Sequence, residues 1–331
     1  MSIIARAPGK VVVLGEYAVL KGAPALVLAV DCYCRAEISQ SSDAQCHLRS
    51  WAPELREMRF DSSARSGVPL VDAVVHGSSA GSAWRGELDS RALYSGLGKL
   101  GIGSSAAALT AWAGVWRTFV GLGSLEKNTE NLSALIGLHR TLQGGFGSGL
   151  DVAASLFGAM ISFELKEESA PVVCSVRLPG SVAFAGVFVG RSLSTQDFLS
   201  RFNDWQIECP AQAAERLVAL ACLAETGCAA ARENDGGAFL SAVAEYGEGL
   251  AHLGEAMGID IVTSAHREIA SEAKRYSVVY KVSGAGGGDL GLAFSADTEA
   301  LDAFLRNMEN SRYKIINLRL DEQGLCVEGH I

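Results

Sequence analysis

KLGIGSSAAA, residues Lys99–Ala108, predicts a glycine-rich turn that leads into a helix. Gly101 and Gly103 carry no Cβ, so the backbone can turn closely around a ligand. Ser104 and Ser105 suit the N-cap of the helix, whose free N–H groups and positive dipole end attract anions. The stretch therefore predicts a phosphate cradle with a lysine at its start. An ordinary capped turn before an alanine-rich helix is the alternative that this stretch alone leaves open.

Two better-known phosphate-binding motifs do not fit the sequence. A Walker loop continues from Gly-Lys into Ser or Thr, whereas here Leu100 follows that pair and Leu93 stands where the first Gly belongs. The dinucleotide spacing Gly-x-Gly-x-x-Gly begins at Gly286, but an expected strand at 290–295 follows it where that motif requires a helix. Any phosphate site must therefore be of another kind.

The composition limits the class of protein. A chain of 331 residues, 49% hydrophobic and 20% charged, fits two modest domains of a globular protein. Its net charge of −9, without any basic run, argues against nucleic acid or an anionic membrane as a partner. No apolar run is long enough to span a membrane, no signal peptide is evident, and the eight cysteines lack paired metal-ligand spacing. We therefore expect a cytoplasmic protein with reduced thiols.

Periodicity and turn residues predict the order of strands and helices. Strands are expected at about 3–14, 25–30, 33–38, 46–51, 87–95, 159–164, 172–178, 183–189, 278–282, 290–295 and 313–319. Helices are expected at about 69–78, 106–119, 126–142, 152–157, 196–205, 211–257 with a break near 234–237, 264–276 and 297–310. The final order of helix, strand, strand, helix and strand suggests a split β-α-β unit.

Two further residues stand beside glycine-containing turns. Lys10 follows a Pro-Gly break in the first strand, which displays it at a fixed point. Asp151 follows the glycine-rich turn 143–150 and opens an apolar helix. A solvated lysine and a helix N-cap are the plainer interpretations of these two residues.

Three glycine-rich motifs, in order along the chain, resemble those of the GHMP kinases, the superfamily of galactokinase, homoserine kinase, mevalonate kinase and phosphomevalonate kinase. They lie at 7–20, 101–107 and 283–289. Gly15-Glu16-Tyr17 resembles the phosphomevalonate kinase form, because mevalonate kinases usually carry His after the Glu. The turn 147–154 also resembles that form, since it lacks the Pro and Asn of the mevalonate kinase turn.

The resemblance implies an α+β, two-domain GHMP kinase fold. Residues 1–190 would form an ATP-binding domain like the second domain of ribosomal protein S5, and residues 191–331 a ferredoxin-like C-terminal domain. It also implies ATP as co-substrate, Mg²⁺ and a small-molecule acceptor, 5-phosphomevalonate, in a monomer or homodimer. Mevalonate or another small molecule is the alternative acceptor, and a non-catalytic nucleotide-binding sensor is the alternative of a different class.

The resemblance assigns roles to the matching positions. Catalysis would rest on Lys10 and Asp151, and Ser105 would supply a magnesium-binding hydroxyl. Contacts with the ATP phosphates are expected from Lys99, Gly101, Gly103, Ser104, Ser105 and Ala106. Contacts with the acceptor are expected from Lys10, Tyr17, Ser148, Arg191, Ser194, Thr195, Ser283, Gly284, Ala285 and Gly286.

One departure from the family pattern concerns the metal. Mevalonate kinases carry a magnesium-binding Glu about ten residues before the catalytic Asp, whereas this chain has Leu-His-Arg-Thr at 138–141. Arg140 could instead help to hold an extra phosphate. The histidines, including His139 and His266, show no metal spacing and are interpreted as structural.

Overall fold

The computed structural model describes residues 2–76, 80–96, 98–166, 169–190, 195–288 and 290–329. Its strands are β1 (Ser2–Leu14), β2 (Ala25–Gln40), β3 (Cys46–Trp51), β4 (Leu55–Phe60), β5 (Trp84–Asp89), β6 (Tyr94–Ser95), β7 (Gly98–Lys99), β8 (Met160–Glu164), β9 (Val172–Val176), β10 (Ala183–Phe188), β11 (Val279–Val282), β12 (Leu290–Ser295), β13 (Lys314–Ile316) and β14 (Cys326–Glu328). Its α-helices are α1 (Pro69–Val75), α2 (Ser104–Phe119), α3 (Thr129–Leu142), α4 (Leu150–Phe157), α5 (Thr195–Glu208), α6 (Pro210–Arg232), α7 (Gly236–Met257), α8 (Ser264–Arg275) and α9 (Thr298–Glu309).

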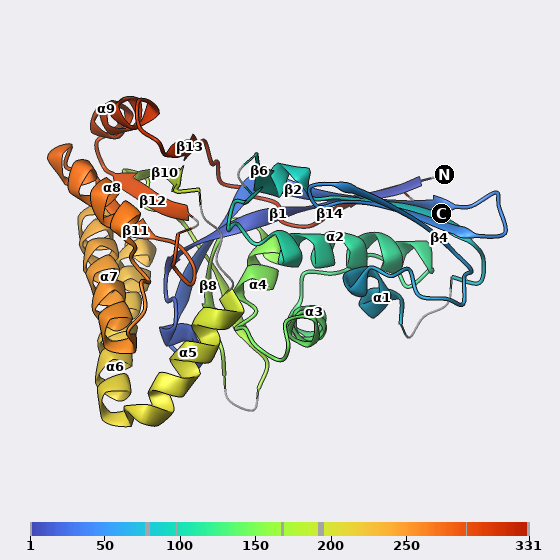
Figure 1. Ribbon diagram of the computed structural model, residues 1–331, viewed down its shortest axis with the longest axis horizontal. Helices are drawn as coiled ribbons and strands as arrows, with labels where there is room; N and C mark the ends of the chain where they lie inside the picture. The colour runs from blue at the N-terminus through green and yellow to red at the C-terminus, as the bar shows by residue number, and fades with distance from the viewer. Residues whose placement is uncertain are drawn as a thin grey trace.

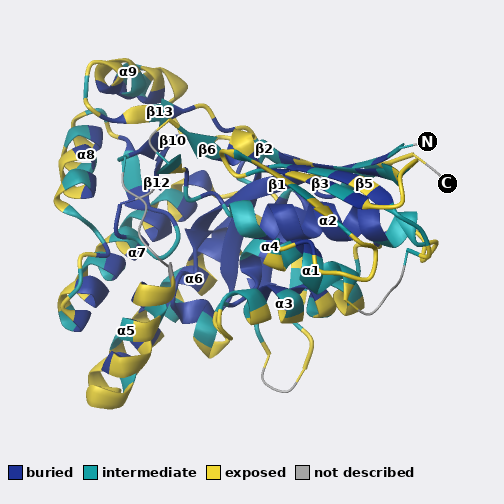
Figure 2. Ribbon diagram, turned by 45° about the vertical axis from the view of Figure 1, so that its right-hand side comes forward, coloured by how far each residue is buried: buried dark blue, intermediate teal, exposed yellow. Residues whose placement is uncertain are grey.

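A long first sheet forms one half of the molecule, with strand order β14-β1-β2-β5-β3-β4 and with β8 and β9 branching from β2. Only the β3–β5 pair is parallel among the pairings of described residues in this sheet. Helices α1 to α4 lie along one face of it (Figure 1). The alanines at the start of α2 let this helix pack closely, and most of its residues are buried (Figure 2).

The register between the first two strands shifts at two places, between Pro8 and Gly9 and between Val12 and Leu14. The β1–β2 register shifts between Pro8 and Gly9, where proline cannot donate to the ladder, so the predicted interruption of the first strand is confirmed. The prediction of two separate strands at 25–30 and 33–38 is wrong, because β2 continues through both. Its polar Asp31 lies in the bulge, where it pairs with Arg319 through a backbone and a side-chain hydrogen bond.

A second, antiparallel sheet has the order β11-β12-β10-β13 and packs against α8 and α9, which agrees with the expected split β-α-β unit. Helices α6 and α7 pack against each other beside it (Figure 1). Strand β10 precedes residue 190 but belongs to this sheet, and β14 returns to the first sheet beside β1. The division into 1–190 and 191–331 stays a prediction.

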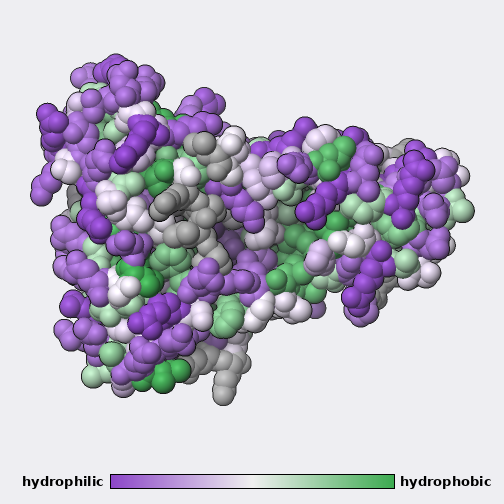
Figure 3. Space-filling view, in the orientation of Figure 1, coloured by the Kyte–Doolittle hydropathy of each residue, from purple (hydrophilic) through white to green (hydrophobic). Residues whose placement is uncertain are grey.

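Other sequence-based bounds also need correction. The expected strand at 87–95 ends at Asp89, because a 3₁₀ turn at Arg91–Leu93 follows it. Strand β4 was not predicted, since its exposed residues show no clear alternation. Among the described helices, none has the length and apolar character needed to cross a bilayer. Hydrophilic side chains dominate the face in Figure 3, and hydrophobic ones gather in the region of α2.

Candidate active site

The glycine-rich turn before α2 leaves the start of that helix open. Gly103 is the N-cap in the left-handed conformation, at φ 78°, and no side chain caps the helix. The prediction that Ser104 and Ser105 form the cap is therefore wrong, because both already lie inside the first turn. The first N–H groups of an α-helix have no partner within the helix, so this end can bind an anion.

Lys10 lies across this turn. Its backbone N–H donates to the carbonyl oxygen of Ile102 at 2.8 Å, which fixes β1 against the loop. A Cβ on Gly103 would lie only 3.0 Å from Lys10 Cγ, so the lysine stem covers the glycine. A Cβ on Gly284 would lie 3.9 Å from Lys10 Nζ. The amino group therefore stands between the second and the third glycine motifs.

Asp151 enters the site from α4. Gly149, at φ 89°, is the N-cap of this helix, so the alternative interpretation of Asp151 as the N-cap is wrong. The carboxylate instead accepts from the Val152 backbone N–H at 3.0 Å and keeps 22% of its side chain exposed. Lys10 and Asp151 are both described, and no ion pair within 4.0 Å joins them.

His139 lies on α3 and Gln143 just after it, and together they connect Asp151 with Ser105 in the first turn of α2. His139 is 3% exposed, and its Nε2 lies 3.0 Å from Ser105 Oγ and 3.1 Å from Gln143 Nε2. Its Nδ1 lies 3.9 Å from Asp151 Oδ1. The prediction that His139 is purely structural did not anticipate these contacts. The place of His139 in the segment where mevalonate kinases carry a metal-binding Glu was the one available signal.

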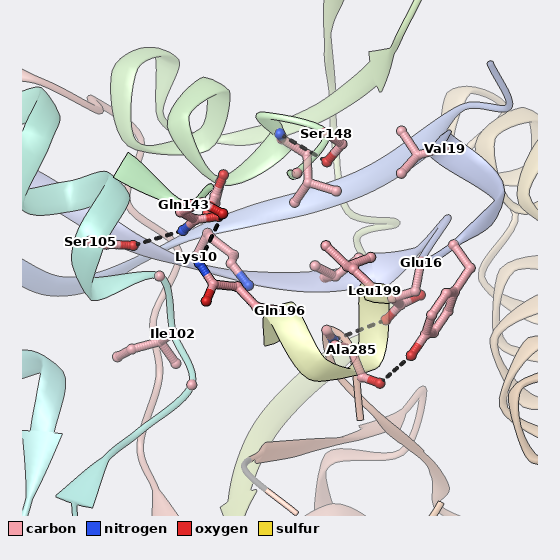
Figure 4. A pocket seen from close by; sticks show the side chains of 18 of the residues that line it. Lys10, Glu16, Val19, Ile102, Ser105, Gln143, Ser148, Gln196, Leu199 and Ala285 are labelled. Carbon is pink, nitrogen blue, oxygen red and sulfur yellow. Dashed lines mark hydrogen bonds between the residues drawn. The ribbon is translucent and has the colours of Figure 1, made fainter. Parts of the chain in front are cut away.

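Lys10, Ser105, Gln143 and Asp151 line one cavity of about 550 Å³ (Figure 4). Eleven of the predicted site residues line it, namely Lys10, Tyr17, Lys99, Gly101, Gly103, Ser104, Ser105, Ser148, Asp151, Gly284 and Ala285. The close-up shows Lys10, Ser105 and Gln143 together on one side, with Glu16 and Ala285 farther along the cavity. The three glycine turns, far apart in the sequence, thus meet at one place.

Three predicted site residues are described but do not line the cavity. Ala106 is fully buried in the core. Ser283 is bonded to β1, because its hydroxyl accepts from Val12 N at 2.8 Å. Gly286 lies so close to Ile261 that a Cβ would come within 2.6 Å of the Ile261 carbonyl oxygen. Ser283 and Gly286 therefore hold the third motif in place.

Three predicted acceptor-binding residues fall wholly or partly outside the described residues. Arg191 and Ser194 lie outside the described residues, and of Thr195 only the backbone, at the start of α5, is described.

Arg140 does not line the cavity: its guanidinium donates to the carbonyl oxygens of Gly147 at 2.9 Å and Ser148 at 3.3 Å. It supports the loop, contrary to the expectation that it helps to hold a phosphate.

A buried ion pair closes the far side of the cavity. Lys281 Nζ donates to Glu16 Oε1 at 2.6 Å, and both side chains are almost fully buried. Burial lowers the pKa of Lys281, while the Glu16 carboxylate acts in the opposite direction. Glu16 also accepts from Gly284 N at 3.3 Å, whereas its Oε2 has no hydrogen-bond partner among the described residues. The pair was not predicted, because 265 residues separate its members.

Tyr17 adds a second link to the third motif. Its hydroxyl donates to the Ala285 carbonyl oxygen at 2.6 Å, and its ring packs on Phe202 of α5. Burial raises the pKa of Tyr17, so the hydroxyl keeps its proton and acts as a donor. Near the other wall, Gln196 of α5 donates to the Gln143 carbonyl oxygen at 2.8 Å. The start of α5 therefore packs against the turn before Asp151.

The donor set at the open helix end suits a hard cation. Ser105 and Asp151 offer oxygen atoms beside the open start of α2, and Mg²⁺ prefers a few protein oxygens completed by water and substrate phosphates. Among the described residues, no cluster of three His, Cys, Asp or Glu side chains could hold a metal ion by itself. A magnesium ion here would therefore depend on a bound nucleotide.

Solved structures share this arrangement of elements. Lin0012 from Listeria innocua matches with a TM-score of 0.87 and 21% identity, covering 99% of both chains. Streptococcus pneumoniae phosphomevalonate kinase in complex with phosphomevalonate and AMPPNP has a TM-score of 0.80 and 17% identity, covering 96% of this chain and 99% of that one. Mevalonate kinase of L. major in complex with R-mevalonate has a TM-score of 0.74 and 17% identity, covering 96% and 95%.

The chain therefore has the α+β fold of the GHMP kinases, and the predicted resemblance is confirmed. Among curated proteins, the phosphomevalonate kinase of Streptomyces sp. strain CL190 is 25% identical over 345 residues, covering 90% of this chain and 91% of that protein. No family model matches the chain. Similarity in sequence and in fold thus extends over nearly the whole chain.

Proposed function

We propose that this chain is an ATP- and Mg²⁺-dependent small-molecule kinase that phosphorylates 5-phosphomevalonate to 5-diphosphomevalonate. The observation that carries the proposal is one cavity bounded by Lys10, the open start of α2 and Asp151. We also propose that residues 1–190 supply most of the nucleotide site, with the second sheet completing the acceptor site.

Phosphoryl transfer depends on positioning and charge neutralisation more than on covalent chemistry by the protein. The backbone N–H groups from Gly103 to Ala106 would hold the nucleotide phosphates. Lys10 would contact the transferred group, because its amino group stands between the second and third motifs. Ser105 and Asp151 would hold Mg²⁺, which when bound neutralises phosphate charge.

The acceptor determines how much Asp151 must do. An oxygen of the acceptor phosphate attacks the γ-phosphorus of ATP, the bond from that phosphorus to the β–γ bridging oxygen breaks, and ADP leaves. A phosphate monoester is already largely ionised near neutral pH, so no proton has to be removed first. Besides holding Mg²⁺, Asp151 would then orient Lys10 and the acceptor. With mevalonate, the alternative acceptor, it would have to accept the hydroxyl proton.

The phosphomevalonate assignment draws support from two sources. The curated relative at 25% identity is a phosphomevalonate kinase, and the turn before Asp151 resembles the form in those enzymes. The fold alone does not select the acceptor, because mevalonate kinase of L. major shares it. Mevalonate kinase activity therefore remains the second candidate function.

The test is ADP release with mevalonate, 5-phosphomevalonate and 5-diphosphomevalonate offered separately. We expect turnover with 5-phosphomevalonate alone. Activity only on mevalonate would select the second candidate, and nucleotide binding without turnover on any acceptor would favour a sensor. Lys10→Met should lower kcat about 100-fold or more, as the loss of one preorganised charge contact does. Lys314→Met, at an exposed position on β13, is the matched control and should leave kcat unchanged.

Asp151→Asn separates the two chemical roles. A measurable residual rate on 5-phosphomevalonate is expected, because the acceptor oxygen is already ionised. A complete loss of turnover with normal acceptor binding and an unchanged Mg²⁺ requirement would instead mean that proton removal is obligatory.

A further inference from the structure

His139 lies between two side chains to which the proposed function gives separate tasks. Ser105 belongs to α2 and Asp151 to α4, and His139 reaches both from α3. Its Nε2 lies 3.0 Å from Ser105 Oγ and its Nδ1 lies 3.9 Å from Asp151 Oδ1. At 3% exposure the imidazole is held in one place, so it can fix the separation of its two neighbours.

The contacts of Gln143 select one tautomer of this imidazole. The amide nitrogen of Gln143 can only donate, and it lies 3.1 Å from His139 Nε2. Nε2 must therefore be the acceptor, and the proton lies on Nδ1, which faces the Asp151 carboxylate. The same amide nitrogen lies 3.5 Å from Ser105 Oγ, so the Gln143 amide and the Ser105 hydroxyl share the single lone pair of Nε2 in a three-centre contact. This leaves a lone pair of Ser105 Oγ available to the cavity that it lines.

We propose that His139 is a positioning residue for phosphoryl transfer, which orients the Ser105 hydroxyl through a hydrogen bond at Nε2 and faces the Asp151 carboxylate with the Nδ1–H dipole at 3.9 Å. The inference rests on the proposed function, since it concerns the two residues that would hold the metal. Mutation of a residue that orients a metal ligand through a hydrogen bond typically lowers metal affinity or activity about 10- to 100-fold.

The experiment compares three substitutions that separate the two contacts. The His139→Gln amide reaches the place of Nε2 and keeps the contact with Ser105, whereas the His139→Asn amide reaches the place of Nδ1 and keeps the contact with Asp151. His139→Ala keeps neither. His252→Gln, at an exposed position of α7, is the matched control. Turnover, acceptor KM, the Mg²⁺ concentration for half-maximal rate, and thermal unfolding are measured for each.

We expect His139→Ala to lower kcat about 10- to 100-fold, with a smaller change in acceptor KM. His139→Asn should raise the Mg²⁺ requirement more than His139→Gln does, because it loses the 3.0 Å contact with Ser105, whereas His139→Gln loses only the 3.9 Å approach to Asp151. If kcat stays at the wild-type value in His139→Ala, or if all three variants lose rate only in proportion to their folded fraction, the inference is wrong. A wild-type protein without turnover on any acceptor would instead refute the proposed function.

A second readout needs neither nucleotide nor turnover. Nitrogen-15 imidazole spectra of the free protein should show His139 with Nε2 unprotonated and Nδ1 protonated, and the signal is assigned by its loss in His139→Gln. Asp151→Asn should shift the Nδ1 resonance, because its carboxylate partner is gone. The opposite tautomer, or a His139 signal that does not respond to Asp151→Asn, would overturn the positioning role.

Discussion

The backbone amide of Lys10 donates to the carbonyl oxygen of Ile102 at 2.8 Å, which joins the first glycine motif to the second at the level of the main chain. The position of the turn before α2 relative to strand β1 is therefore fixed before any ligand binds. Gly9 makes this approach possible, since a Cβ there would come within 2.6 Å of the same carbonyl oxygen.

We predict that Gly9→Ala disrupts this contact and destabilises the protein by about 1–3 kcal/mol, as overpacking against backbone does. Nucleotide affinity should fall as well, because the loop must move away from β1. Urea unfolding and calorimetric titration with AMPPNP measure the two effects. Gly137→Ala on α3 is the control, because nothing lies within 4 Å of its Cβ position. It should be neutral or stabilising, since alanine favours a helix. Equal behaviour of the two variants would contradict the steric argument.

Tyr17→Phe removes the hydroxyl that donates to Ala285 at 2.6 Å. A loss of about 1 kcal/mol in stability is expected, the usual net value of such a bond. Acceptor KM should rise more than nucleotide KM, because the freed backbone of the third motif lines the cavity. Steady-state kinetics with each substrate varied measures this. In Tyr276→Phe the lost hydroxyl makes no hydrogen bond with the described residues, so both KM values should be unchanged; a similar KM change there would count against the link.

The buried ion pair of Glu16 and Lys281 leads us to predict that substitutions of the two residues have non-additive effects on stability. Lys281→Met leaves the Glu16 carboxylate buried without its partner, which should cost about 3–5 kcal/mol of stability. Adding Glu16→Gln should restore most of that loss, since no charge is then left buried. Urea unfolding of the two single variants and the double variant gives the coupling energy. Additive losses would show that the charges do not act as a pair.

An exposed arginine provides the scale for this comparison. Arg49 of β3 pairs with Glu57 of β4 and with Glu87 of β5, each at 3.0 Å, and about half of the Arg49 side chain lies in solvent. Arg49→Met should therefore cost less than about 1 kcal/mol of stability per ion pair lost. A smaller loss in Arg49→Met than in Lys281→Met is the result expected if burial determines the cost of removing a paired cation.

His266 predicts how stability changes in acid. Burial lowers the pKa of His266 from 6.5 to about 4. Below pH 6.5 the His266 side chain of the unfolded chain takes up a proton, whereas that of the folded chain does so only near pH 4. The free energy of unfolding therefore falls between pH 6.5 and pH 4, and the full contribution of His266 is present above pH 6.5. The loss amounts to up to about 3 kcal/mol. Urea unfolding at pH 7 and pH 4 should show a smaller loss for His266→Gln than for wild type; an equal loss would assign the acid sensitivity to other groups.

The sequence allowed the prediction of local features more fully than of contacts between distant elements. The Pro-Gly break in β1 and the glycines before α2 and α4 mark where the chain turns, so Lys10, Ser105 and Asp151 could be placed beside turns. Their assignment to one site came from the resemblance to the GHMP kinases. Ser104 and Ser105 were misplaced as caps because the conformation of Gly103 is set by packing under Lys10.

Contacts that depend on how elements pack left little trace in the sequence. The sequence around His139 is that of an ordinary buried helix position. Only the packing of α3 against α2 and α4 brings the side chain to the site. Strand β14 has three residues, too few to show a hydrophobic period, and it exists because β1 offers it a free edge.

The pairing of Ile4 with Glu328 has a consequence for biosynthesis. The first sheet receives its edge strand β14 from residues that the ribosome translates after α9. Closure of that edge therefore has to follow the synthesis of the entire second sheet, so the first sheet cannot be completed before β11, β12 and β13 have been made.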